Sequence, residues 1–128
     1  MSRQLNKILV VDDDERNIFA LKAVLASRGF SCVTARGGWQ AVDILQQQQD
    51  IVLALVDMMM PGMDGYELIK KVHATPALNH VRLIAVTAQA MAGDREKCLA
   101  AGADAYIAKP VDTDILFSVV QEQLKNAG

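Results

Sequence analysis

Short apolar segments alternate with stretches of helical periodicity along the whole chain, and this alternation limits the fold more than any other feature. The segments 7–11 and 51–56 are apolar almost throughout, which is typical of parallel strands covered by helices on both faces. Right-handed crossovers between such strands give a doubly wound α/β sandwich. The strands are expected at residues 7–11, 31–35, 51–56, 81–86 and 105–108.

The segments between these strands carry apolar residues at helical spacing. A fourth helix is expected at 93–101 and should stop at Gly102. Of the common strand orders for five such units, 2-1-3-4-5 is the flavodoxin-like one, and we adopt it for this (βα)5 chain. The predicted inward stripes are Ile18, Leu21, Val24 and Leu25; Ala41, Ile44 and Leu45; Leu68, Ile69 and Val72; and Ile115, Leu116, Val119, Val120 and Leu124.

The length of 128 residues suits one domain spanning 1–128, with a core at about residues 6–126. No segment approaches the roughly 18 apolar residues that cross a bilayer, and the start of the chain lacks the apolar part of a signal peptide. We therefore expect no membrane insertion and a cytoplasmic location. A formal net charge of -2 argues against direct nucleic-acid binding, which needs clustered Lys and Arg. Cys32 and Cys98 are expected to be buried or half-buried thiols.

Polar side chains follow four of the five predicted strands at the point where each strand ends. Ligands of doubly wound sheets bind in the crevice beyond these carboxyl ends. The predicted strand order puts Asp57 on the middle strand, with an acidic cluster on one side and a hydroxyl and an amine on the other. This is the geometry of a nucleophile between a metal site and an anion clamp. The flanking residues are Asp12, Asp13, Asp14, Thr87 and Lys109.

Carboxylates that converge at a sheet edge repel one another and must be neutralised by protons or by a cation. Ligands that are all oxygen favour magnesium, calcium or manganese over zinc or copper. A divalent ion together with Lys109 would balance Asp12, Asp13 and Asp57, and the ion and the lysine would each hold a phosphoryl oxygen. Each residue alone has an ordinary structural explanation, such as helix capping by Asp14. Their convergence on one crevice favours function.

The chain resembles the receiver domain of two-component response regulators over essentially its whole length, and four segments carry the resemblance. They are ILVVDDDERN (8–17), LVDMMMPGMDGYEL (55–68), IAVTAQA (84–90) and AGADAYIAKPVD (101–112). The resemblance implies a phosphoprotein in which Asp57 accepts a phosphoryl group from phosphohistidine with Mg²⁺ as cofactor, or Mn²⁺ in its place. Asp12, Asp13 and Asp57 would hold the ion, Asp12 mainly through water, with the Met59 backbone carbonyl as a further ligand.

The same resemblance assigns roles on the other side of the crevice. Thr87 would contact the phosphoryl group after transfer, and Lys109 would pair with it. The peptide bond before Pro110 is expected to be cis. Tyr106 would be the aromatic switch that turns inward as Thr87 moves toward the phosphate, since added charge can bias a bistable pair of side chains.

The implied partners are a histidine kinase or a histidine phosphotransfer domain and a downstream protein that binds the face made by the fourth helix, fifth strand and fifth helix. The segment 93–112 is similar to receivers of hybrid histidine kinases and phosphorelays, so both a stand-alone regulator and one module of a longer protein stay open. Such a domain is a phosphoacceptor that catalyses its own phosphotransfer and slow dephosphorylation, and acts on no external substrate. Met59 and Gln89 are predicted to set the phosphoryl lifetime.

Three other functional classes are alternatives for a chain of this pattern. A flavodoxin-like cofactor binder needs a loop rich in hydroxyls and glycine after the first strand, whereas Asp12 and its acidic neighbours would repel the FMN phosphate. An aspartyl phosphatase of the haloacid dehalogenase kind needs a second Asp at the position of Met59. A pure interaction module would show no Mg²⁺-dependent labelling. His73 and His80 are expected in solvent, and Trp39 at the surface or in packing.

Overall fold

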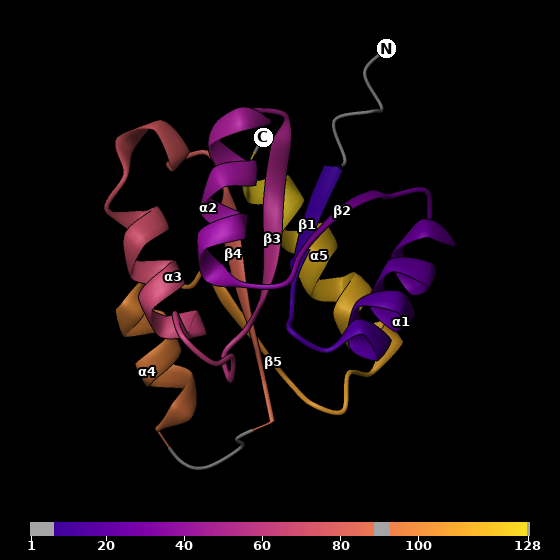
Figure 1. Ribbon diagram of the computed structural model, residues 1–128. Helices are drawn as coiled ribbons and strands as arrows, with labels where there is room; N and C mark the ends of the chain where they lie inside the picture. The colour runs from indigo at the N-terminus through magenta and orange to yellow at the C-terminus, as the bar shows by residue number, and fades with distance from the viewer. Residues whose placement is uncertain (1–6, 89–92, 128) are drawn as a thin grey trace.

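The computed structural model describes residues 7–88 and 93–127 (Figure 1). Within these residues five strands alternate strictly with five α-helices, as the sequence predicts. A short 3-10 helix, η2 (Pro76–Leu78), precedes the fourth strand. The elements are β1 (Lys7–Val11), α1 (Glu15–Ala26), β2 (Ser31–Ala35), α2 (Gly38–Gln47), β3 (Ile51–Asp57), α3 (Gly65–His73), β4 (Arg82–Thr87), α4 (Asp94–Ala101), β5 (Ala105–Ala108) and α5 (Thr113–Ala127).

The strands form one parallel sheet in the order β2-β1-β3-β4-β5, which confirms the predicted flavodoxin-like arrangement. Helices α2, α3 and α4 cover one face of the sheet, and α1 and α5 cover the other (Figure 1). In β1, Leu9 and Val11 join the first of these cores, whereas Ile8 and Val10 join the second. Since side chains alternate between the faces, a strand covered on both sides has to be apolar throughout.

The strand bounds agree with the prediction to within one residue. β3 extends to Asp57 itself, and β4 begins at Arg82 and ends at Thr87. The fourth helix starts after Gly93, whose φ of 96° lies in the left-handed region, and stops at Gly102, whose φ is 122°. Both positions need a residue without a Cβ.

One prediction for the last helix is wrong. Ile115 was expected to face the core, but its side chain is 53% exposed, whereas Leu116 and Val120 are buried. Adjacent residues of a helix point about 100° apart, so Ile115 falls outside the apolar face that Leu116 occupies. Val119 and Leu124 are half-buried and pack against the core as predicted.

Side-chain caps fix the loops that precede the first and third helices. Asp14 caps α1 by accepting a hydrogen bond from the Arg16 amide at 2.9 Å. Asp64 and Glu67 form a capping box at the start of α3, in which each side chain accepts from the backbone of the other. These caps anchor the loops that follow β1 and β3, which are the loops nearest the predicted site.

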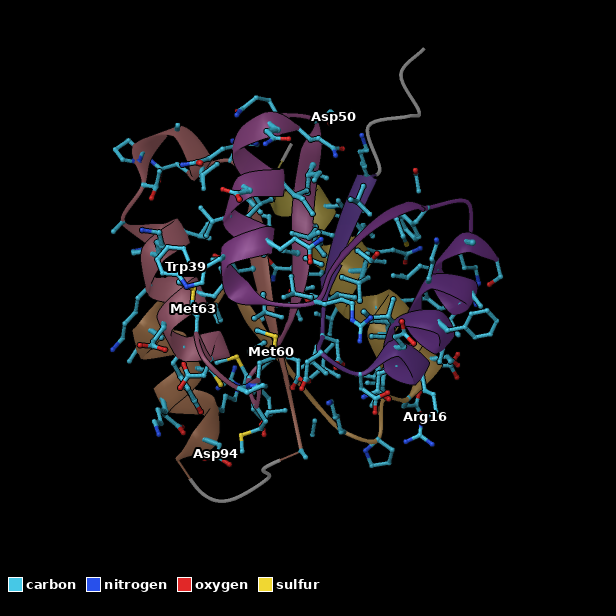
Figure 2. All side chains as sticks on the ribbon, viewed as in Figure 1. Arg16, Trp39, Asp50, Met60, Met63 and Asp94 are labelled. Carbon is cyan, nitrogen blue, oxygen red and sulfur yellow. The ribbon has the colours of Figure 1, made fainter. Side chains whose placement is uncertain are left out.

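The remaining expectations concern residues away from the strand ends. Cys32 is half-buried and Cys98 is buried, and both are free thiols as predicted. His73 and His80 are exposed. Trp39 is 65% exposed and lies between α2 and α3 with Met63 (Figure 2), where the Lys71 ammonium sits 5.4 Å from the indole centroid. No helix among the described residues combines the length and apolar character needed to cross a membrane.

Candidate metal centre and its neighbours

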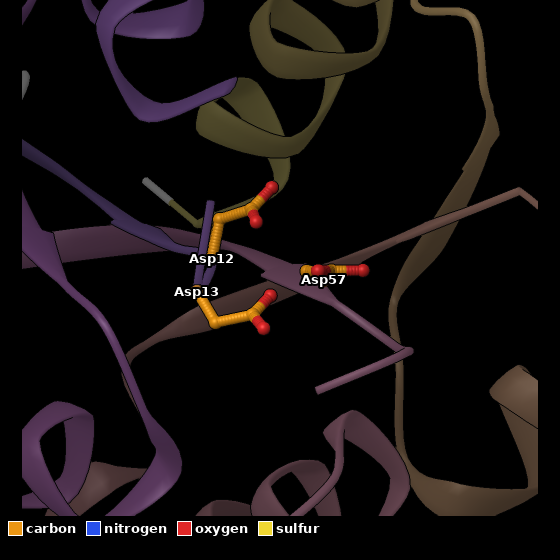
Figure 3. A group of neighbouring side chains, drawn as sticks. All are labelled: Asp12, Asp13 and Asp57. Carbon is orange, nitrogen blue, oxygen red and sulfur yellow. The ribbon is translucent and has the colours of Figure 1, made fainter. Parts of the chain in front are cut away.

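Three carboxylates converge where β1 and β3 end side by side. Asp12 and Asp13 follow β1, and Asp57 is the last residue of β3. One oxygen from each of the three lies within 4.8 Å of the others, and the side chains point into a common space (Figure 3). The sheet brings them together because β1 and β3 pair in parallel, with Val11 opposite Val56. The predicted acidic cluster is therefore present, with all-oxygen ligands.

Asp12 is held in place by the backbone around it. Its side chain is almost fully buried, and Oδ1 accepts a hydrogen bond from the Asp14 amide at 2.9 Å. Burial raises the pKa of Asp12, and the nearby negative charge of Asp57 adds to the rise, whereas the Asp14 hydrogen bond and Lys109 oppose it. A cation bound here would stabilise the charged form of this buried carboxylate and reduce its repulsion with Asp57.

Asp57 is fixed both by its strand and by the loop that follows. Its side chain is 5% exposed, and Oδ1 accepts a hydrogen bond from the Met59 amide at 3.1 Å. The amide of Met58, the residue that follows Asp57, donates to the Val86 carbonyl of β4 at 3.0 Å. Asp13, by contrast, is exposed, so the cluster opens to solvent on its side.

Lys109 reaches the cluster from the end of β5. Its Nζ lies 3.4 Å from Asp57 Oδ1 and 3.9 Å from Asp12 Oδ2. The Lys109 amide donates to the Thr87 carbonyl at 2.8 Å, which ties the loop after β5 to the end of β4. The Lys109–Pro110 peptide bond is cis, as predicted. One ammonium therefore faces two of the three carboxylates.

Thr87 and Tyr106 lie on neighbouring strands, on the same face of the sheet. Tyr106 pairs with Ala85, and Thr87 is two residues beyond Ala85 on β4. Thr87 is 1% exposed, whereas Tyr106 is half-buried against the core under α2, α3 and α4. Burial raises the pKa of the Tyr106 hydroxyl. Tyr106 thus lies one strand further out than Thr87 and two residues further from the carboxyl ends of the strands.

Of the two residues predicted to set the phosphoryl lifetime, Met59 belongs to the described part of the chain. Met59 is 53% exposed at the rim of the cluster. Gln89 lies outside the described residues. The Met59 amide donates a hydrogen bond to Asp57. Coordination of a metal ion by the Met59 carbonyl stays a prediction.

Sequence reasoning missed two features of this region. A Cβ on Gly65 would lie 2.6 Å from the Met58 Cα and 2.8 Å from the Asp57 carbonyl oxygen, so the start of α3 packs directly on the loop that holds Asp57. No sequence pattern pointed to this close approach. On the other rim, Arg36 pairs with Glu15 at 2.7 Å, which joins the end of β2 to the start of α1. No sequence pattern pointed to that ion pair.

An apolar hollow of about 260 Å³ opens next to the cluster. It lies between α1, α5 and the loop after β5, and Asp12 and Lys109 form its polar edge. Its apolar lining includes Ala20, Leu21 and Pro110. A partner that reaches Asp57 from this side would meet an apolar surface.

Comparison with known protein families matches residues 8–121 to the response regulator receiver domain. The chain belongs to this family. Receiver domains are the signalling phosphoacceptor domains of two-component systems. The receiver is 35% identical over 125 residues to hybrid signal transduction histidine kinase I of Dictyostelium discoideum, a match that covers 92% of this chain and 7% of that protein. It is 37% identical over 116 residues to response regulator PleD of Caulobacter vibrioides, covering 90% of this chain and 25% of PleD.

The receiver therefore spans a small part of these curated relatives. Among solved structures, it superposes with a TM-score of 0.85 on the receiver domain of sensor histidine kinase PA1611 from Pseudomonas aeruginosa, with 34% identity over 94% of this chain and 98% of that one. That receiver has a magnesium ion coordinated in its active-site cleft. Membership in this family favours a signalling receiver over the cofactor-binding and phosphatase alternatives.

Proposed function

We propose that Asp57 accepts a phosphoryl group from a phosphohistidine in a Mg²⁺-dependent reaction. The observation that carries the proposal is the convergence of Asp12, Asp13 and Asp57, with the Lys109 ammonium 3.4 Å from Asp57. The donor would be a histidine kinase or a histidine phosphotransfer domain. Residues 1–128 would act as one receiver unit, in the cytoplasm, with no direct contact to nucleic acid.

The donor set fits Mg²⁺ better than a soft metal. All three groups are carboxylates, and Mg²⁺ takes oxygen ligands at about 2.1 Å, so oxygens on opposite sides of the ion are about 4 Å apart. Ligand atoms within 4.8 Å of one another need only a small side-chain adjustment to reach that spacing. When bound, the ion would offset the negative charge of the cluster and of the incoming phosphoryl oxygens. Mn²⁺ has similar oxygen ligands and would substitute.

The residues of the chain would then carry the transfer. An oxygen of the Asp57 carboxylate attacks phosphorus, the bond from phosphorus to the donor imidazole breaks, and an aspartyl phosphate forms. Lys109, which faces Asp57 and Asp12, would pair with a phosphoryl oxygen once the charge of Asp57 is lost. Thr87 would donate its hydroxyl to another phosphoryl oxygen. The apolar hollow beside Lys109 would receive the donor domain.

The output would follow from the movement of Thr87. Tyr106 lies on the same face of the sheet, one strand further out, and its half-buried ring can occupy the space that Thr87 leaves. The resulting change would be read by a downstream protein on the face made by α4, β5 and α5. Slow self-catalysed hydrolysis would end the signal, with Met59 and Gln89 setting its rate. Met59→Asn should change the dephosphorylation half-life.

The proposal is tested by incubating the protein with Mg²⁺ and acetyl phosphate, followed by intact mass and phosphate-affinity electrophoresis. We expect one phosphoryl group on the wild type and none on Asp57→Asn or in EDTA. Asp50→Asn is the matched control, since Asp50 pairs with Lys7 at the other end of the sheet, far from the site (Figure 2). Labelling that persists in Asp57→Asn, or that ignores EDTA, would overturn the proposal. Continuous turnover of the phosphodonor at many cycles per minute would favour a phosphatase.

A further inference from the structure

The three consecutive methionines after Asp57 differ sharply in exposure. Met58 is 1% exposed and Met60 is 5% exposed, and both belong to the core under α2, α3 and α4. Met59 between them is 53% exposed. The packing therefore protects two of the three thioethers and leaves the middle one open to solvent.

The exposed methionine is also the one bonded to the acceptor. Its amide donates to Asp57 Oδ1 at 3.1 Å, so its side chain starts beside the carboxylate that we propose as the phosphoryl site. The side chain lines a shallow surface hollow with Met60, Pro61 and Lys97. A change in the chemistry of this exposed side chain is therefore made two residues from Asp57, on a backbone bonded to its carboxylate.

We propose that Met59 is an oxidation site that couples peroxide to the lifetime of the phosphoryl group. The inference rests on the proposed phosphorylation of Asp57. A lone pair of the Met59 sulfur attacks one oxygen of hydrogen peroxide, the O–O bond breaks as the S–O bond forms, and the peroxide proton ends on the departing oxygen to give water. The sulfur is oxidised by two electrons and the peroxide is reduced.

The product differs from methionine in the property that matters at this position. The thioether is a weak hydrogen-bond acceptor, whereas the sulfoxide is polar and carries an oxygen that accepts hydrogen bonds well. A water that attacks the aspartyl phosphate reacts faster when an acceptor orients it. Oxidation of Met59 should therefore shorten the phosphoryl lifetime, and reduction of the sulfoxide should restore it.

The other sulfur atoms of the described residues are less open to peroxide. Met63 is half-buried, and its side chain lies against Gly38. Cys98 is buried. Cys32 is half-buried, and burial raises the pKa of its thiol, which lowers the amount of the reactive thiolate.

The experiment treats the full chain with hydrogen peroxide in the presence of EDTA, removes the oxidant, and maps sulfoxides by peptide mass. We expect Met59 to be oxidised before Met58 and Met60. Treated and untreated protein are then loaded with Mg²⁺ and acetyl phosphate, and the decay of the phosphorylated form is followed after the donor is removed. The expected half-life is about threefold to tenfold shorter after oxidation, which is the rate equivalent of one hydrogen bond.

The variants separate the possible outcomes. In Met59→Leu the half-life should be the same before and after peroxide, whereas Met63→Leu should respond like the wild type. Treatment with a methionine sulfoxide reductase should restore the longer half-life. Equal half-lives in oxidised and untreated wild type, or a shortening that persists in Met59→Leu, would overturn the inference. Failure of untreated protein to incorporate phosphate would instead overturn the proposed function.

Discussion

At the scale of single residues, the Lys109 ammonium partly neutralises the carboxylates of Asp57 and Asp12. The ammonium lies within 4 Å of both Asp57 and Asp12, and the side chain is 25% exposed. Removing this charge leaves a cluster of carboxylates with less compensation, which destabilises the metal-free protein. The same change removes repulsion toward a divalent cation. Stability without metal and affinity for metal should therefore move in opposite directions.

We predict that Lys109→Met lowers the free energy of unfolding in EDTA by about 1–2 kcal/mol and tightens Mg²⁺ binding about threefold to tenfold. Urea unfolding at pH 7 measures the first, and calorimetric titration with Mg²⁺ the second. Lys7→Met is the matched control, because Lys7 forms an exposed ion pair with Asp50 and such pairs contribute little. Weaker Mg²⁺ binding by Lys109→Met would contradict the charge argument.

Sequence alone could predict which residues meet at the site, but it did not predict the exposure of Met59 and was wrong about that of Ile115. Asp12, Asp57 and Lys109 lie at the carboxyl ends of strands, and these ends share one sheet edge in a parallel sheet, so their meeting follows from strand order. The exposure of Met59 depends on the path of the loop after β3, and the hydrophobic periodicity of helices and strands does not apply to a loop. The predicted burial of Ile115 was wrong because this residue lies at the border of the apolar stripe of α5.

At the scale of secondary-structure elements, the contact between α3 and the end of β3 sets the position of Asp57. Gly65, the first residue of α3, lies against the backbone of Met58 and Asp57. A methyl group here would meet the flexible Met58 side chain, but also the Met58 Cα and the Asp57 carbonyl oxygen, which are backbone atoms. The loop or the helix must therefore shift.

Gly65→Ala should therefore destabilise the protein by about 2–3 kcal/mol, in the range of overpacked cores, and should slow labelling of Asp57 by acetyl phosphate. Gly37→Ala is the matched control, because a Cβ at Gly37 meets nothing within 4 Å and its φ of -167° is open to any residue. We expect that variant to stay within about 1 kcal/mol of the wild type. Denaturant unfolding and the labelling rate are measured on both proteins. Equal stability of the two variants would show that α3 is free to move.

A second contact between elements joins α3 to α4. The Cys98 thiol of α4 donates to the Tyr66 hydroxyl of α3 at 3.9 Å, and the Lys97 ammonium lies 4.7 Å from the centroid of the Tyr66 ring. Burial, followed by the contact with Cys98, raises the pKa of Tyr66 to about 12. The folded protein thus keeps the Tyr66 proton at a pH at which the unfolded chain releases it.

The sign of the pH dependence follows from this difference. Between the ordinary tyrosine pKa of about 10 and the folded value, the native state binds more protons than the unfolded state, so stability falls as pH rises. We predict that Tyr66→Phe loses less stability than the wild type between about pH 9 and about pH 11, because it has no hydroxyl to ionise. At pH 7 the variant should be nearly as stable as the wild type. Urea unfolding of the two proteins at about pH 9 and about pH 11 is the measurement. An equal loss of stability in both would contradict the raised pKa of Tyr66.

At the scale of the whole molecule, the acidic cluster lies at the middle of the sheet. Its carboxylates come from the ends of β1 and β3, and these two strands lie between β2 on one side and β4 on the other. The strand order was readable from the βα alternation because few topologies suit five such units. The bridge among Arg82, Gln123 and Asp104, which ties β4 to α5 at the opposite end of the sheet, had no counterpart in any sequence pattern.

Mg²⁺ should consequently stabilise the molecule as a unit. Since β1 and β3 cannot open without separating the carboxylates, binding should raise the free energy of global unfolding by RT ln(1 + [Mg²⁺]/Kd), about 2.7 kcal/mol at one hundred times Kd. Amides of β1, β3 and β4 that exchange with solvent only through global unfolding should all gain protection by this same amount. Native-state hydrogen exchange with and without Mg²⁺ measures the increments strand by strand. Asp13→Asn should lose most of the gain, because it removes the most exposed carboxylate of the cluster without disturbing a buried side chain. Protection that rises equally in Asp13→Asn would mean that Mg²⁺ stabilises the protein elsewhere.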